Sequence, residues 1–85
     1  MSSYDEIPAE ILTLGPDFVQ IWQLLPPLIT REKFAEATGG AYRARHMANL
    51  DSKGQGPAQR VLVGPKVCYR RTEAVLWLAS RTKAL

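Results

Sequence analysis

Residues 28–50, LITREKFAEATGGAYRARHMANL, contain two short amphipathic segments on either side of a glycine pair. Thr30 precedes the first segment, and its hydroxyl can accept a hydrogen bond from one of the free backbone N–H groups at the start of a helix. The pattern predicts a helix over residues 31–37, a break at Gly39–Gly40, and a second helix over residues 41–50. Two helices joined by a short turn that contains glycine are typical of a helix-turn-helix.

The next residues predict a hairpin and a final helix. Residues 51–57, DSKGQGP, have the composition of a loop. Two β-prone runs, 60–63 and 67–70, flank Gly64-Pro65-Lys66 and therefore predict a β-hairpin. We expect Thr72 to cap the last helix. A hairpin placed directly after a helix-turn-helix is the wing of a winged helix-turn-helix.

Residues 1–27 predict one or two short N-terminal helices. Gly15 is suited to end the first, and Pro16 fits the first position of the second. The second helix carries apolar residues at i, i+3, i+4 and i+7, which is an amphipathic stripe: Phe18, Ile21, Trp22 and Leu25. The stripe can cover the protein's own core or bind a partner. The expected fold is mainly α with a small β-hairpin, a winged helix-turn-helix over residues 28–85 that follows an acidic helical extension over residues 1–27.

Charge divides the 85-residue chain into two unlike parts. Residues 1–29 contain four acidic and no basic side chains, whereas residues 30–85 hold all 11 basic residues and a net charge of +7. Such asymmetry indicates a polyanion-binding region that follows an acidic segment with a separate role. A basic surface that is merely solvated is the alternative that charge alone leaves open.

The second helix of the helix-turn-helix has two distinct faces at 100° per residue. One face is small and apolar, and comprises Ala41, Ala44, Met47 and Ala48. The other face is polar and poor in acids, and comprises Tyr42, Arg45, His46 and Asn49, with Arg43 on its flank. Arginine can donate two hydrogen bonds to guanine and asparagine can pair with adenine in the major groove of DNA. This face therefore predicts the DNA-recognition surface, against the alternative of a solvated helix face.

The hairpin is expected to add contacts to the DNA backbone or to the adjacent minor groove. Its candidate residues are basic: Arg60, Lys66, Arg70 and Arg71. We expect Tyr69 to pack beneath the wing, and Cys68 and Trp77 to lie in the core.

Other classes of function lack support in the sequence. His46 has no Ser, Cys or carboxylate neighbour that would indicate an activated nucleophile, so we expect no enzyme and no catalytic residue. No Cys/His cluster or phosphate-binding loop predicts a metal or cofactor. No apolar run approaches the roughly 20 residues of a membrane span. With the single Cys68 and no export signal, we expect a cytoplasmic protein without a membrane partner.

The stretches LITREKFAEATGGAYRARHMANL and GPAQRVLVGPKVCYRRTEAVLWL resemble the small excisionase and AlpA-type proteins of the MerR-like winged helix-turn-helix group. The match in the second half lies in Gly56-Pro57, Gly64, Tyr69-Arg70-Arg71, Thr72 and Trp77-Leu78. The resemblance implies a DNA-binding protein of a phage or mobile element, which acts as an excisionase or a transcription regulator. It implies double-stranded DNA as the partner, with self-association on adjacent sites and an integrase as further partners, and a nucleoid location when bound. A protein-interaction module that uses the stripe of Phe18, Ile21, Trp22 and Leu25 is the alternative.

Overall fold

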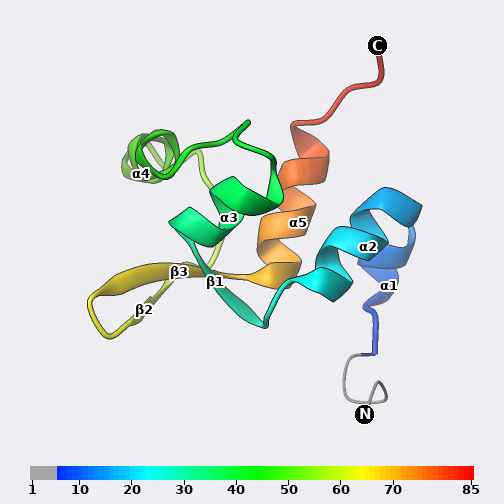
Figure 1. Cartoon of the computed structure of the whole chain (residues 1–85), viewed down its shortest axis with the longest axis horizontal. Coiled ribbons are helices and arrows are strands. Elements are labelled where there is room, and N and C mark those ends of the chain that lie inside the picture. The colour runs from blue at the N-terminus through cyan, green and yellow to red at the C-terminus, as the bar shows by residue number, and fades with distance from the viewer. Residues whose placement is uncertain (1–5) are drawn as a thin grey trace.

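Five helices and a three-stranded antiparallel sheet build the part of the chain that the structure describes, residues 6–85 of a computed structural model (Figure 1). In chain order these are α1 (Ala9–Leu12), α2 (Pro16–Leu24), β1 (Leu28–Thr30), α3 (Arg31–Ala37), α4 (Ala44–Ser52), β2 (Val61–Val63), β3 (Lys66–Arg70) and α5 (Arg71–Ser80). The expectation of helices with a small hairpin is confirmed. No helix within residues 6–85 is both long and apolar enough to cross a bilayer.

The hairpin forms where the sequence predicts it and gains a third strand. β2 pairs with β3 so that Val63 lies opposite Lys66, which leaves Gly64 and Pro65 as the two-residue connection. Gly64 has φ of +59°, and proline requires a negative φ, so glycine is needed at the first position of this II′-like turn. The strand that sequence reasoning missed is β1, which pairs with β3 on its other edge, with Thr30 opposite Cys68. The chain that enters α3 is therefore hydrogen-bonded to the hairpin.

The first helix of the predicted helix-turn-helix begins at the expected residue, but the second begins three residues late. The Thr30 hydroxyl accepts a hydrogen bond from the Lys33 backbone N–H at 3.1 Å and so caps α3. Gly39 and Gly40 both have positive φ, and the turn continues through Ala41 because the Tyr42 backbone N–H donates to the Thr38 hydroxyl at 3.3 Å. α4 consequently begins at Ala44, and the predicted helical position of residues 41–43 is wrong.

The start of α5 also differs from the prediction. The helix begins at Arg71, so Thr72 lies inside its first turn and does not cap it. The Thr72 hydroxyl instead accepts a hydrogen bond from the Trp22 indole N–H at 2.9 Å. The hydroxyl that was predicted to cap α5 thus bonds to a side chain of α2 instead.

A single core connects the N-terminal helices to the rest of the chain. Ile11 of α1 and Trp22 of α2 belong to the same buried cluster as Phe34, Tyr69 and Val75. Within the predicted stripe Trp22 and Leu25 are 4% exposed, and Phe18 and Ile21 pack on the cluster as half-buried residues. The stripe therefore covers the protein's own core.

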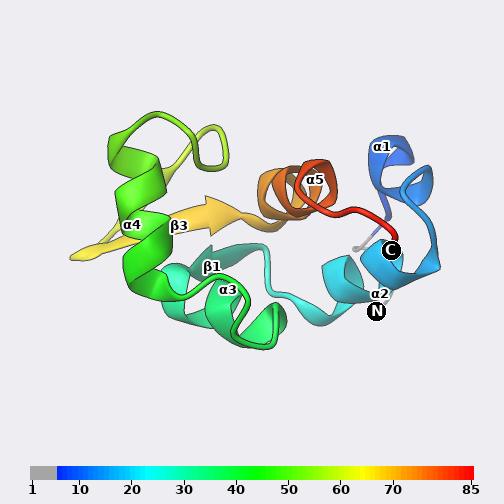
Figure 2. The ribbon, with the colours of Figure 1, turned by 90° about the horizontal axis from the view of Figure 1, so that it is seen from above.

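The arrangement separates two ends of the molecule. Figures 1 and 2 place α4 and the β2–β3 hairpin at one end and α1 and α2 at the other, with α5 between them. The predicted recognition elements thus lie far from the N-terminal helices.

Candidate nucleic-acid interface

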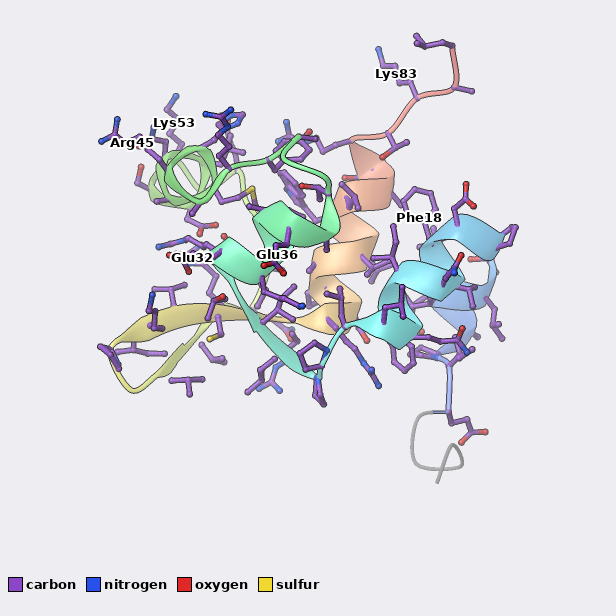
Figure 3. All side chains as sticks on the ribbon, viewed as in Figure 1. Phe18, Glu32, Glu36, Arg45, Lys53 and Lys83 are labelled. Atoms are coloured by element: carbon purple, nitrogen blue, oxygen red, sulfur yellow. The ribbon has the colours of Figure 1, made fainter. Side chains whose placement is uncertain are left out.

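The outer face of α4 presents polar side chains to solvent. Arg45, His46 and Asn49 are exposed, whereas Met47 and Leu50 are buried on the opposite face. Arg45 and Lys53 extend from the side of α4 that faces away from α3 (Figure 3). Met47 lies inward as predicted, and Ala44 and Ala48 beside it are half-buried. Ala41 was expected on that face, but it lies exposed in the preceding turn.

Tyr42 has a different position from the one that the sequence predicts. It precedes α4 and is half-buried, with its ring 6.3 Å from that of Phe34 and 4.9 Å from that of Trp77. Its other neighbour is His46, whose ring is stacked with that of Tyr42 at 5.7 Å. Trp77, expected in the core, is half-buried beside it and donates its indole N–H to the Gln55 carbonyl oxygen at 2.9 Å. Tyr42 therefore packs beneath His46, and little of its own side chain is left to contact DNA.

Apart from Arg71, the 11 basic side chains fall into two groups by their partners. One group forms ion pairs within the chain: Arg31 and Arg60 with Asp51, Lys33 with Glu36, and Lys66 with Glu32. Over residues 6–85, a second group has no carboxylate within 4.0 Å: Arg43, Arg45, Lys53, Arg70, Arg81 and Lys83. Apart from Arg70, this second group lies on α4 and at the end of α5. These cations are therefore available to an anionic partner without breaking an internal pair.

Two of the four predicted basic contacts of the wing, Lys66 and Arg60, are exposed but paired. The Lys66 ammonium lies 3.6 Å from Glu32 Oε2, and Arg60 Nη1 lies 3.7 Å from Asp51 Oδ1. A hydrogen bond from the backbone of Glu32 itself, helped by Lys66, lowers the pKa of that carboxyl. The Lys66–Glu32 pair is exposed on both sides and therefore weak, so a phosphate can replace this carboxylate at small cost. The carboxylate partner of Arg60 is buried.

Arg71 does not lie with the other predicted contacts. It is 8% exposed, and its guanidinium carbon is 3.5 Å from the centre of the Trp22 ring. Its Nη1 donates to the Leu25 carbonyl oxygen at 2.7 Å. The side chain thus joins the start of α5 to the end of α2, and we assign it to the core and not to the interface. Its neighbour Arg70 is exposed at the base of the wing.

A buried carboxylate, which sequence reasoning placed in a loop, joins the elements of the interface. Asp51 lies in the last turn of α4 and its side chain is 3% exposed. Its Oδ2 accepts hydrogen bonds from the Tyr69 hydroxyl at 2.7 Å and from Arg31 Nη2 at 2.8 Å, and Oδ1 faces Arg60. We call these four residues the Asp51 network. It connects α3, α4 and the β2–β3 hairpin.

The pKa of Tyr69 and the close approach of Gly56 show how closely the Asp51 network is enclosed. Burial, followed by the hydrogen bond to Asp51, raises the pKa of Tyr69 far above its usual value of 10. A Cβ atom on Gly56 would overlap Asp51 Oδ1, so the loop can pass over the carboxylate only with glycine at this position. The predicted packing of Tyr69 under the wing is confirmed, as is the burial of Cys68.

Comparisons with protein-family models, with curated proteins and with solved structures find no significant match to this chain. Within residues 6–85, no group of three His, Cys, Asp or Glu side chains is placed to hold a metal ion.

Proposed function

We propose that the protein binds double-stranded DNA sequence-specifically through a winged helix-turn-helix and acts for a phage or mobile element as an excisionase, a transcription regulator, or both. α3 and α4 are its helix-turn-helix, and β2 and β3 are its wing. The observation that carries the proposal is the outer face of α4. There, unpaired cations stand beside exposed His46 and Asn49, and the one acid of the helix, Asp51, is buried.

The dimensions and chemistry of α4 suit the major groove. With its side chains an α-helix is about 10–12 Å across, which fits a groove about 12 Å wide. Arg45 has the donors to recognise guanine, and Asn49 one turn later can pair with adenine. Arg43, at the N-cap of α4, is suited to a flanking phosphate, and the wing adds Arg60, Lys66 and Arg70 on the backbone or in the minor groove.

The position of the acidic N-terminal segment is compatible with DNA bound at α4 and the wing. Glu10 of α1 and Asp17 of α2 lie at the end of the molecule opposite α4 and the wing (Figure 2). Their carboxylates would therefore be far from bound phosphates, where repulsion is small. Asp5, which also contributes to the acidic charge, lies outside the described residues.

The choice of an excisionase or a regulator follows the resemblance described above. An excisionase binds adjacent sites, bends DNA and assists an integrase, and self-association would help to fill those sites. A regulator would use the same contacts at a promoter. The alternative, a protein-interaction module that uses the α2 stripe, is less well supported because Trp22 and Leu25 are already buried in the core.

We expect duplex binding that weakens steeply with salt. If about five to seven phosphates are neutralised, the logarithm of the association constant should fall against the logarithm of salt concentration with a slope of about −5 to −6. Fluorescence anisotropy with labelled duplexes between about 50 and 200 mM salt measures this slope. Affinity that hardly changes over this range would argue against DNA as the partner.

Substitutions on α4 and on the wing should differ in kind. Arg45→Ala and Asn49→Ala should each cost about 1–3 kcal/mol on the target site and relax the preference at particular base pairs. Lys66→Ala should weaken binding to all sequences alike, because a phosphate contact carries no base information. Binding selection from a randomised duplex library gives both readouts, and Gln23→Ala, an exposed change beyond the interface, is the control. A change of base preference in the Lys66 variant alone would assign recognition to the wing instead.

A further inference from the structure

A continuous series of ring contacts leads from the outer face of α4 to the end of α5. His46 stacks on Tyr42 at 5.7 Å, and Tyr42 meets Trp77 edge-on at 4.9 Å. At the α5 end of this series, the guanidinium carbon of Arg81 lies over the Trp77 ring, 5.0 Å from its centre. The ring contacts therefore connect Arg81, after α5, to His46 on the proposed recognition helix.

Arg81 is held in place by neutral groups, which leaves its charge uncompensated. Its Nη2 donates to the Gln55 carbonyl oxygen at 3.2 Å, an oxygen that also accepts from the Trp77 indole. Within residues 6–85 no carboxylate lies within 4.0 Å of this guanidinium. A guanidinium has five N–H donors, so several remain for an anion.

No acidic side chain of residues 6–85 lines the hollow beside Arg81. Arg81 and Thr82 line this shallow hollow together with Thr38 and His46, and its apolar lining includes Ile21 and Leu78. Beyond it Lys83 extends on the same side of the molecule as Arg45 and Lys53 (Figure 3). Residues 74–85 contain no Asp or Glu.

We propose that Arg81 and Lys83 form a second phosphate-binding flank, which holds the DNA backbone on the side of α4 away from the wing. The inference rests on the proposed function and adds a site that the sequence did not indicate. When α4 lies in the major groove, the phosphates of the two strands border it on both sides. The wing can reach one border with Arg70 and with Arg60 and Lys66, of which the last two are already paired to Asp51 and Glu32. The end of α5 can reach the other with unpaired cations.

The test measures salt dependence on a random-sequence duplex, because phosphate contacts do not depend on sequence. We expect Arg81→Gln and Lys83→Gln each to reduce the magnitude of the salt slope by about 0.9. Each should accordingly lower the ratio of affinities at about 50 and 200 mM salt by a factor of about 3.5. Lys33→Gln removes the same charge near α2, where Lys33 pairs with Glu36, and should leave the slope unchanged.

Further variants separate this site from stability and from the proposed function. Arg81→Lys keeps the charge and should retain the slope, whereas Lys83→Gln removes a side chain with no contact to the core. If the double variant Arg81→Gln/Lys83→Gln keeps the wild-type slope while Arg45→Ala weakens binding, the second flank is wrong and DNA binding stands. If the wild-type protein shows no salt-dependent duplex binding, the proposed function itself fails.

Discussion

Replacing Asp51 with alanine is expected to lower the free energy of unfolding by about 3 kcal/mol. The change removes the acceptor of the buried Tyr69 hydroxyl and the carboxylate that pairs with Arg31. Loss of one member of a buried, hydrogen-bonded pair costs about 3–5 kcal/mol, and the lower value applies because the Arg31 side chain is 23% exposed and can reach water. Urea denaturation curves, monitored by circular dichroism, measure this change in the free energy of unfolding.

Two further substitutions test whether the effect belongs to the Asp51 network. Asp51→Asn keeps one oxygen acceptor and should cost about 1–2 kcal/mol. Glu36→Ala also removes a carboxylate with a cationic partner, but its side chain is 74% exposed and the change should cost less than about 0.5 kcal/mol. Equal losses in Asp51→Ala and Glu36→Ala would mean that the buried network makes no special contribution to stability.

Local signals predicted the elements that depend on neighbouring residues. The Thr30 cap is visible because its hydroxyl bonds within the next turn, to Lys33. The hairpin is visible because Gly64 and Pro65 restrict their own backbone and the strands follow at once. In both cases the partners lie within a few residues, so the sequence contains the whole interaction.

The missed features depend on residues far apart in the chain. Asp51 resembles a loop residue by composition, and only its contacts with Arg31, 20 positions earlier, and Tyr69, 18 positions later, make it a buried centre. Arg71 resembles a surface cation until Trp22, in α2, covers it. Arg81 follows the last helix in sequence, and the ring contacts of Trp77 and Tyr42 bring it beside α4. Long-range packing, which local patterns do not specify, decides which charges reach the surface.

Replacing Trp22 with alanine should destabilise the protein by about 3–5 kcal/mol, a large part of the stability of a small domain. The ring is 4% exposed, its N–H donates to Thr72, and its face lies under the Arg71 guanidinium. Without it a cavity remains and a buried cation loses the ring beneath it. Trp22→Phe keeps an aromatic face under the Arg71 guanidinium. It should therefore lose less than half as much stability as Trp22→Ala. Thermal unfolding of the two variants and the wild type gives the comparison.

Deleting residues 1–27 is the stronger form of the same change. The remainder would lose Ile11, Trp22 and Leu25 from the shared core, and Arg71 would lose the Leu25 carbonyl that it binds. A chain of this length has a thin core even when complete, so we expect the truncated protein to show no cooperative unfolding transition. If it instead remains folded and binds single DNA sites normally, but no longer fills adjacent sites cooperatively, the N-terminal helices pair protomers and do not complete the core. If it keeps stability, oligomeric state and cooperativity alike, the acidic segment has neither role, and the contacts of Trp22 with Thr72 and Arg71 do not stabilise the protein in solution.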